Sequence, residues 1–299
     1  MFARSLLMLF VLAAAPVLAQ AQEKSLADRL MPLIKAHRGK VAVALLHLDD
    51  GVSFDCDGDE PMPTGSLIKF MVMIEVYQQV AEGKVKLSDI VVLRDSDKVQ
   101  GSGILTYHFS DGATFPLRDA VRLMIAFSDN TATNLVLDRI GIPSTNRRMA
   151  DWGFPNSRIH AKVFRGSTTS IDPERTKKFG LGSTTAKETV GLLKRLYDGK
   201  CGDNQATREM IEHLKKCEDK DKIKRFLPAG VVVANKSGSV NDIKTDAGIM
   251  YFSGGPVALC VLTSQNEDRR YHPDNEGNIV IGRIAEQVYL HFAKTPPKK

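Results

Sequence analysis

Two side chains that together can cleave an amide, Ser66 and Lys69, lie three residues apart at the start of an apolar stretch. In a helix this spacing places them on one face, one turn apart, so that the amine reaches the hydroxyl. A serine hydroxyl becomes a good nucleophile when a base removes its proton, and a desolvated lysine has a pKa low enough to be that base. Taken alone, the pair is better explained by a capping serine and a surface lysine, because this spacing occurs by chance about once or twice in such a chain.

Two further motifs follow this pair along the chain. Ser128-Asp129-Asn130 lies between two helical stretches, and Lys236-Ser237-Gly238 lies at the end of an expected strand, 231–235. Each motif alone is explained as a helix-capping cluster or a strand-ending turn. All three in this order, at a helix start, an interhelical loop and a strand end, indicate nucleophilic catalysis by a serine.

The hydrophobic periodicity predicts the elements that must position these motifs. Helical periods cover 25–37, 66–79, 117–127, 131–140, 185–197 and 279–292, and strands are expected at 41–48, 52–54, 231–235, 246–252 and 257–264. The strands therefore come from both ends of the chain, with helices between them. We predict an α/β plus all-α fold, in which helices flank the sheet and an inserted helical domain meets it at a cleft.

With these motifs the chain resembles the penicillin-recognising serine enzymes, and within them the class A β-lactamase family. The resemblance extends from about Ser25 to Phe292, and it includes Thr131-Ala132-Thr133-Asn134-Leu135, Thr184-Thr185-Ala186 and Ile284-Ala285-Glu286. It implies the β-lactamase / D,D-peptidase fold, with an antiparallel sheet. The expected domains are an α/β domain of residues 22–60 and 200–299, and an all-α domain of residues 61–199.

The resemblance also implies a catalytic role for each motif residue. Ser66 would attack the carbonyl of a β-lactam or an acyl-D-alanyl peptide, and Lys69 would be a base for that step. The backbone N–H groups of Ser66 and Ser239 would bind the oxyanion. Ser128 would pass a proton to the leaving nitrogen, helped by the positive field of Lys236.

A second set of residues would bind the substrate. These residues are Asn130, Ser237, Gly238, Ser239 and Tyr107, with Lys244 and Arg283 as candidates for a further cation. Asn130 would hold Lys69 and the substrate's amide side chain, and Ser237 would hydrogen-bond the substrate carboxylate. Tyr107 falls where the family has an aromatic wall of the cleft, although a structural aromatic is an equally good interpretation.

One loop departs from the family's pattern. Class A β-lactamases carry Arg-x-Glu-x-x-Leu-Asn there, and the glutamate activates the water that hydrolyses the acyl-enzyme. Here residues 162–170 contain no glutamate, and the remaining carboxylates of residues 154–180 are Asp172 and Glu174. Glu174 would be the replacement base if the loop folds back, and an exposed loop carboxylate otherwise. Without such a base, acylation would survive while deacylation became slow.

Charge and composition narrow the class of partner. The 299 residues include 41 Lys+Arg and 35 Asp+Glu, and acidic residues are interleaved with basic ones almost throughout. No sustained basic stripe is present, so nucleic acid is not an expected partner. The densest basic run, 215–225, also contains three acidic residues, and we interpret it as a solvated helix face.

Residues 1–21 have the three-part pattern of a secretory signal peptide. Arg4 precedes an apolar run over 6–15, and cleavage is expected after Ala19 or Ala21. The apolar run is too short to span a bilayer comfortably, so we expect no membrane insertion after cleavage. The mature chain is expected to be a periplasmic or secreted monomer.

Four cysteines, Cys56, Cys201, Cys217 and Cys260, permit two disulfides in three pairings, and their spacing does not choose among them. A buried free thiol is at least as good an interpretation for Cys260, which lies in an apolar run. No Cys or His cluster has metal-ligand spacing, and neither a metal nor an organic cofactor is expected.

The leading hypothesis is therefore an exported serine hydrolase of class A β-lactamase type that opens β-lactam amides through an acyl-enzyme on Ser66. The first alternative is a D-Ala-D-Ala peptidase or a slowly deacylating penicillin-binding protein on the same fold. The second is a non-catalytic relative that binds ligand in the same pocket. Fold alone does not separate them.

Overall fold

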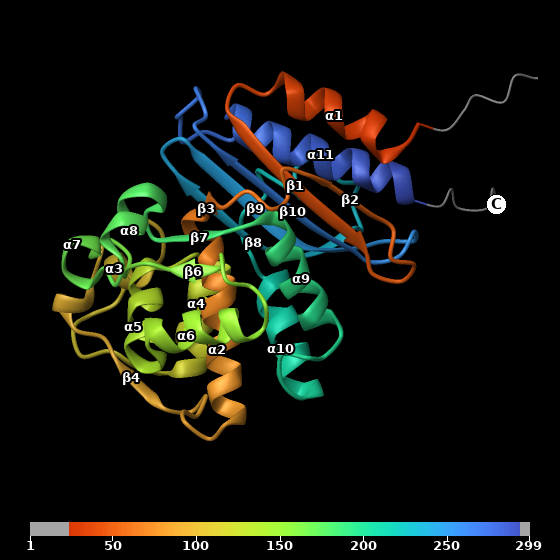
Figure 1. The fold of residues 1–299 in the computed structure, drawn as a ribbon. Coiled ribbons are helices and arrows are strands. Elements are labelled where there is room, and N and C mark those ends of the chain that lie inside the picture. Colours follow the sequence, from red (N-terminus) through yellow and green to blue (C-terminus); the bar gives the residue numbers. More distant parts are fainter. Residues whose placement is uncertain (1–23, 294–299) are drawn as a thin grey trace, which may run out of the picture.

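A five-stranded antiparallel sheet forms the centre of the structure, a computed structural model that describes residues 24–293 (Figure 1). The strand order is β2-β1-β10-β9-β8. The strands are β1 (Lys40–His47), β2 (Ser53–Cys56), β8 (Val232–Val240), β9 (Ile243–Tyr251) and β10 (Val257–Ser264). Because β1 pairs with β10 from Lys40↔Ser264 to His47↔Val257, the N-terminal and C-terminal parts of the chain form one sheet.

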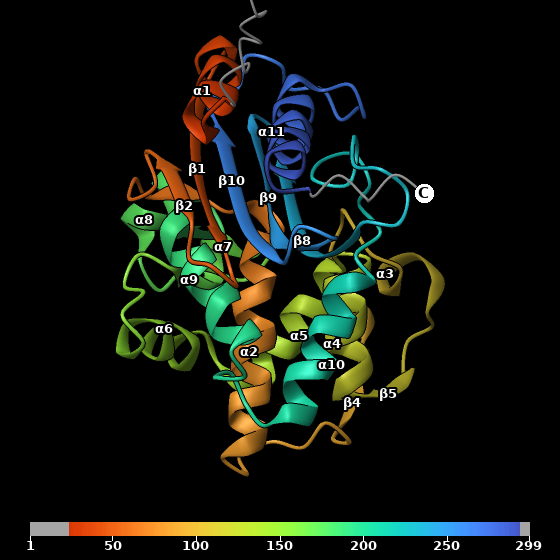
Figure 2. The same cartoon turned by 90° about the vertical axis from the view of Figure 1, so that its right-hand side faces the viewer.

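Two helices from opposite ends of the described chain cover one face of this sheet. They are α1 (Leu26–Ala36) and α11 (Glu276–Phe292), which lie side by side in both ribbon views (Figure 2). Ser25 begins α1 with a capping box, in which its hydroxyl accepts from the backbone N–H of Asp28. Leu30 and Ile281 pack with strand residues such as Leu259 in a core under these helices.

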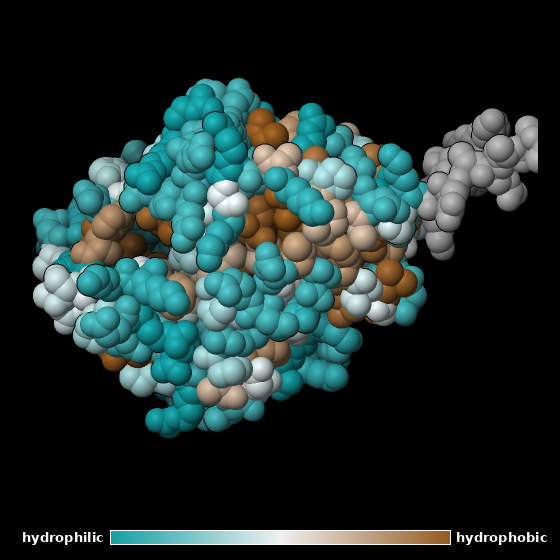
Figure 3. All heavy atoms as spheres, turned by 45° about the horizontal axis from the view of Figure 1, so that its top comes forward, coloured by the Kyte–Doolittle hydropathy of each residue, from teal (hydrophilic) through white to brown (hydrophobic). Residues whose placement is uncertain are grey.

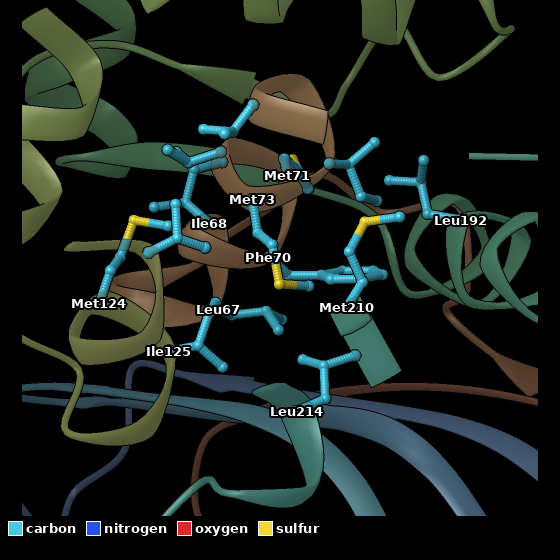
Figure 4. Close-up of a cluster of buried hydrophobic side chains, with 14 of the residues drawn as sticks. Leu67, Ile68, Phe70, Met71, Met73, Met124, Ile125, Leu192, Met210 and Leu214 are labelled. Atoms are coloured by element: carbon cyan, nitrogen blue, oxygen red, sulfur yellow. The ribbon is translucent and has the colours of Figure 1, made fainter. Parts of the chain in front are cut away.

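The helical lobe is built around α2 (Lys69–Ala81), which is apolar on almost every side. Its neighbours include α4 (Leu117–Ala126), α5 (Asn130–Ile140), α6 (Ile142–Asp151) and α10 (Asn204–Lys215). Figure 4 shows Phe70, Met73, Met124 and Met210 among the side chains that meet in this core. A helix that is hydrophobic all round must be surrounded, so the sequence of α2 requires the central position that it occupies.

Two helices join the lobes. α9 (Ala186–Tyr197) contacts β1, β9 and β10, while α10 contacts β8 as well as α2 and α4. The turn between α9 and α10 is where we expected the second boundary between the two domains. Both helices contact the sheet, so the lobes share a packed border there.

Short elements complete the lobe and frame the cleft. They are β3 (Met62–Pro63), η1 (Gly65–Ile68), β4 (Ile90–Val92), η2 (Asp95–Asp97), α3 (Leu105–His108), β5 (Thr114–Pro116), β6 (Arg158–Ile159), α7 (Gly166–Thr169), α8 (Pro173–Phe179) and β7 (Gly182–Thr184). β3, β7 and β6 form a three-stranded sheet, and β4 pairs with β5.

The predicted fold class is confirmed, with three local corrections. β8 does not end at Asn235 but continues through Lys236-Ser237-Gly238 to Val240, paired with β9 throughout. α6 is not among the helical stretches expected from the sequence. Gly141, at φ 79°, both ends α5 and precedes α6. The basic run 215–225 is a loop after α10, and its Lys222 is buried.

The remaining expectations concern the cysteines and the ends of the chain. All four cysteines are free, and Cys201, Cys217 and Cys260 are buried. Over residues 24–293, no helix combines the length and the apolar character that crossing a bilayer requires. The expected signal peptide, residues 1–21, lies outside the described residues.

Candidate active site

Ser66 lies on η1, one short 3-10 turn that leads directly into α2. Its neighbours Gly65 and Leu67 are buried, whereas Ser66 is partly exposed and lines a cleft of about 780 Å³ between the helical lobe and β8. Within residues 24–293 the Ser66 hydroxyl makes no hydrogen bond. It is therefore free to face a ligand in the cleft.

Lys69, the first residue of α2, is completely buried. Its Nζ donates to the Ser128 carbonyl oxygen at 2.5 Å, to Ser128 Oγ at 3.1 Å and to Asn130 Oδ1 at 2.8 Å. Burial holds the pKa of Lys69 well below its usual range, and the charge of Lys236 lowers it further. The amine is thus suited to act as a base, although its hydrogen bonds join it to the Ser128-Asn130 motif and not to Ser66.

Ser128 links the three motifs because it lies in the sharp connection between α4 and α5. Its φ is 52°, in the left-handed region that non-glycine residues seldom adopt. The next residue, Asp129, holds this bend by accepting hydrogen bonds from three backbone N–H groups, those of Ala132, Ile104 and Leu105. The α5 cap therefore also ties the 101–105 loop to the cleft.

Asn130 is fixed on both sides of its amide. Its Oδ1 accepts from Lys69 and its Nδ2 donates to the Gln100 carbonyl oxygen at 3.0 Å. Ser102 adds a hydrogen bond from its Oγ to the Ser128 carbonyl oxygen at 2.7 Å. The loop beside the cleft is thus held in one position relative to Lys69.

Lys236 approaches Ser128 from the sheet. It is buried, and its Nζ donates to Ser128 Oγ at 3.2 Å and to the Ser237 carbonyl oxygen at 2.7 Å. Burial lowers the pKa of Lys236, and the nearby carboxylates and the Cys217 thiol act in the opposite direction. Ser128 consequently lies between two amines, which suits a group that passes a proton.

The edge strand β8 packs directly against η1, and glycine is required at the contact. A Cβ on Gly238 would lie 2.5 Å from the Thr64 carbonyl oxygen and 2.8 Å from the Ser66 backbone nitrogen. Ser239 N lies close to Gly65, at 3.3 Å from an added Cβ there. The backbone nitrogens of Ser66 and Ser239 are thereby held together at one side of the cleft, as an oxyanion hole requires.

Asp219, which sequence analysis did not identify, is the sole carboxylate-bearing residue that lines the cleft in the described chain. Its Oδ2 accepts from Ser237 Oγ at 2.7 Å and from Lys222 Nζ at 2.5 Å, and its Oδ1 accepts from the Asp221 backbone N–H at 2.9 Å. Burial alone would raise the pKa of Asp219, but Lys222 and Ser237 lower it to about 2. Nothing in the local sequence distinguishes this aspartate, because its partners come from another strand.

The loop between α6 and α9 contributes an apolar side chain to the cleft wall. Val163 lines the cleft and is 8% exposed. Asn134 on α5 fixes it from both sides, since Nδ2 donates to the Val163 carbonyl oxygen and Oδ1 accepts from its N–H. Glu174 is exposed on α8 and is not a lining residue. Carboxylates from this loop are therefore absent from the cleft wall of the described chain.

The three remaining substrate-binding candidates, Lys244, Tyr107 and Arg283, are not lining residues of the cleft. Lys244, on β9, donates from Nζ to the carbonyl oxygen of Asn241 and lies 5.1 Å from the Tyr271 ring, and both of these partners line the cleft. Tyr107 is 62% exposed on α3 and is not a lining residue. Arg283 pairs with Glu286 on α11, away from the cleft lining.

The mouth of the cleft is apolar. Phe164, Val240 and Tyr271 line it and are exposed. Figure 3 shows hydrophobic residues within a hollow on the left of the molecule, the side on which Figure 1 shows α3, α7 and α8. In the part of the chain that the structure describes, no three His, Cys, Asp or Glu side chains are grouped to hold a metal ion.

Comparison with known proteins identifies the family. The profile of the β-lactamase enzyme family matches residues 24–292, nearly the whole described chain. The chain belongs to the β-lactamase enzyme family. It is a serine hydrolase of class A β-lactamase type. A β-lactamase of Proteus vulgaris is 27% identical over 282 residues, which cover 91% of this chain and 97% of that protein.

Solved structures agree with the β-lactamase fold. A β-lactamase from Sphaerobacter thermophilus has a TM-score of 0.79 and 28% sequence identity, with 91% of this chain and 98% of that chain covered. A structure of PBP-A has a TM-score of 0.76 and 22% identity, with 89% and 95% covered. The second likeness concerns the fold alone.

Proposed function

We propose that this β-lactamase-family enzyme opens β-lactam amides by acylating Ser66 and then releases the acyl group slowly. The single observation that carries acylation is the buried Lys69 amine, three residues after Ser66 in the chain and hydrogen-bonded to Ser128 and Asn130. Burial holds the pKa of this amine well below its usual range, which favours removal of the serine proton.

Acylation follows from the positions of five residues. Lys69 takes the Ser66 proton, the serine oxygen adds to the carbonyl carbon, and the backbone N–H groups of Ser66 and Ser239 bind the resulting oxyanion. The C–N bond then breaks. Ser128, hydrogen-bonded to Lys69 and Lys236, delivers the proton to the leaving nitrogen and is reprotonated by Lys69.

Slow deacylation is inferred from the cleft wall. Hydrolysis of the acyl-enzyme needs a base to activate water, and removal of a general base typically costs about 10²–10⁴-fold in rate. Val163 lines the cleft, and Glu174 is exposed on α8, so we assign Glu174 no part in this step. The acyl-enzyme is therefore expected to persist.

A D-Ala-D-Ala peptidase or penicillin-binding role remains the second candidate function, and the absence of a carboxylate from this loop at the described cleft wall favours it over rapid antibiotic hydrolysis. One solved structure with the same fold is a PBP-A variant in an acyl-enzyme complex with penicillin G, at 23% identity and a TM-score of 0.76. A non-catalytic binding role is disfavoured, because ligand binding alone needs no buried amine next to a free hydroxyl.

We also propose that the enzyme is exported. The support is the sequence of residues 1–21, with Arg4, an apolar run and small residues at the cleavage point. The test is the N-terminus of the protein recovered from the periplasm and medium of an expressing bacterium. An N-terminus at residue 20 or 22 supports export, and an intact N-terminus in the cytoplasm contradicts it.

The catalytic proposal is tested by mixing the enzyme with a chromogenic cephalosporin while following colour release and intact mass. We expect one equivalent of colour, an adduct on Ser66 and little further turnover. Ser66→Ala should give neither colour nor adduct. Rapid turnover by the wild type would contradict slow deacylation, and absence of an adduct would contradict acylation itself.

The Val163→Glu variant tests the reason for slow deacylation. A carboxylate at this lining position should increase the deacylation rate by about a hundredfold or more. Val163→Gln is the matched control, since it adds the same bulk without a base and should leave the adduct persistent. If both variants deacylate at the same rate, the missing carboxylate is not the cause.

A further inference from the structure

The loop between α6 and α9 places the aromatic ring of Phe164 against the loop of residues 101–105. Both Phe164 and Gly101 line the cleft. A Cβ added to Gly101 would lie 3.1 Å from Cε2 and 3.5 Å from Cζ of Phe164, and 2.7 Å from Nδ2 of Asn130. The edge of the ring therefore rests on the Gly101 backbone beside Asn130, in a space that a glycine leaves open.

The backbone at Phe164 is strained, and the residues on either side of it are held in place. Its φ is 54°, in the left-handed region that an aromatic residue seldom adopts. Asn134 fixes both backbone groups of Val163, and Arg165 donates from Nη2 to the Ser96 carbonyl oxygen. Such strain persists where the surrounding structure over-determines it, and it gathers at binding and catalytic sites. The ring is thus positioned before any ligand arrives.

Most of the Phe164 side chain stays open to solvent despite its contact with Gly101. Phe164 is 60% exposed, whereas Phe179 on α8 is 7% exposed. Phe164 belongs to neither hydrophobic core of the described chain. Packing within the protein therefore does not explain the ring, and exposed apolar surface inside a cleft is typical of a ligand contact.

The cleft wall beside Phe164 carries no unpaired charge from this loop in the described chain. Lys162 lines the cleft, but its Nζ pairs with Asp138. The other lining residues of the loop are uncharged, namely Ala161, Val163, Phe164, Gly166, Thr176, Gly180 and Leu181. A substituent that contacts this wall should therefore be uncharged as well.

The catalytic groups direct the acyl part of a substrate toward this wall. In the proposed reaction Ser66 bonds to the carbonyl carbon, and Ser128, hydrogen-bonded to Lys236, lies at the leaving nitrogen. The two sides of a scissile amide extend in opposite directions. The substituent on the carbonyl side therefore extends away from Lys236, toward the loop that carries Phe164.

We propose that Phe164 is a specificity-determining residue, whose exposed ring face binds a flat aromatic substituent on the acyl side of the substrate. Two aromatic rings attract each other in offset-stacked or edge-to-face arrangements, and a ring that is already fixed loses little freedom on binding. The substrate class is then an amide whose acyl part carries an uncharged aromatic ring. This inference rests on the proposed acylation of Ser66 and deepens it.

The experiment compares benzylpenicillin with 6-acetamidopenicillanic acid, which has the same nucleus and side-chain amide but no aromatic ring. The second-order rate constant of Ser66 acylation is measured by intact mass for each compound. For the wild type we expect benzylpenicillin to react about tenfold faster. For Phe164→Ala we expect this ratio to fall by about fivefold or more, chiefly through the concentration of benzylpenicillin that gives the half-maximal rate.

Three further variants separate ring contact from loss of structure. Phe164→Tyr keeps a flat ring and should keep the wild-type ratio. Phe164→Leu keeps apolar bulk without a flat face, and most of the preference should be lost. Tyr197→Ala removes a partly exposed aromatic at the end of α9, outside the cleft lining, and its ratio should equal that of the wild type. Because the wild-type ratio needs no variant, it remains decisive even if a Phe164 variant folds poorly.

The outcomes are distinct. A wild-type enzyme that is acylated by both compounds at similar rates overturns the inference and leaves the proposed function standing. A Phe164→Ala variant that slows both compounds equally also overturns it, because Phe164 would then only shape the loop. If neither compound ever forms an adduct on Ser66, the proposed function fails and the inference fails with it.

Discussion

Lys69 and Lys236 donate hydrogen bonds to the same atom, Oγ of Ser128, at 3.1 and 3.2 Å. One amine comes from the start of α2 and the other from the middle of β8, and both are buried. Two ammonium groups so close together would repel each other strongly in a dry site. The arrangement therefore favours loss of a proton from Lys69, whose pKa lies well below the usual value of a lysine.

Replacement of Lys236 by glutamine should shift the pH dependence of acylation. Burial and the Lys236 charge both lower the pKa of Lys69, so loss of that charge lets the pKa rise. Lys69 then stays protonated up to a higher pH, so the acidic limb of the pH profile of acylation moves to higher pH. The shift is measured from acylation rates at saturating cephalosporin between about pH 5 and 9. An unchanged limb would mean that another group controls it.

Gly238→Ala should disable the oxyanion hole. The added Cβ would lie 2.5 Å from the Thr64 carbonyl oxygen and 2.8 Å from Ser66 N, and backbone atoms cannot move aside cheaply. We expect acylation to slow by about a hundredfold or more, the typical cost of losing one such donor. Ser239→Ala keeps the backbone N–H of residue 239, so its acylation rate should fall much less. Similar losses in both variants, measured by adduct formation, would argue against the backbone role.

Two asparagines provide a matched test of the cleft wall. Asn134 holds the N–H and carbonyl of Val163, and Asn146 holds those of Ile159 in the same way. Replacement of either by leucine leaves two buried backbone groups unpaired, at a cost of about 2–5 kcal/mol in the free energy of unfolding. Only Asn134→Leu should also alter acylation, because Val163 lines the cleft and Ile159 does not. Urea unfolding and adduct formation measure the two effects, and equal kinetics in both variants would refute the distinction.

Asp246→Asn should change how stability depends on pH. Burial, followed by the charge of Asp219, raises the pKa of Asp246 from 3.8 to about 6. In the wild type this carboxyl stabilises the fold fully below pH about 4, and the contribution is lost as the pH rises through about 6. The variant lacks this loss, so its stability relative to the wild type should improve by up to about 3 kcal/mol over that range.

Urea unfolding at several pH values measures this difference. Asp198→Asn provides a control of opposite sign, because hydrogen bonding to Lys194 lowers the pKa of Asp198. Its stability relative to the wild type should fall as the pH rises towards about 4, and should stay constant above that. If the Asp246 difference did not vary with pH, the carboxyl would not titrate in the folded protein as we expect.

The chemistry of the centre was predictable because each motif lies where local structure changes. A serine at a helix start, a capping cluster between helices and a polar end to an apolar strand are all visible in a single sequence. The strand end was misjudged for a physical reason. Residues 236–240 are polar and contain glycine, which is typical of a turn, yet pairing with β9 and packing against η1 keep them extended.

The remaining parts of the site depend on contacts that no local pattern records. Asp219 is an ordinary loop aspartate until β8 brings Ser237 to it, and Lys222 lies in a run that we expected to be solvated. Val163 is one of several apolar residues in its loop until Asn134 fixes it at the cleft. Sequence analysis missed these residues because their partners are distant in the chain.

β1 pairs with β10, and β8 packs against η1. Ser66 is therefore made well before the residues of β8 that complete the active site. Ser66 leaves the ribosome long before Lys236 and Ser239, so an unfinished chain has a serine but neither the second amine nor the second backbone donor. Contacts this distant in sequence form late and slowly in folding. We therefore expect the unfinished chain to be inert towards reactive amides, so that labelling of Ser66 would report completed folding.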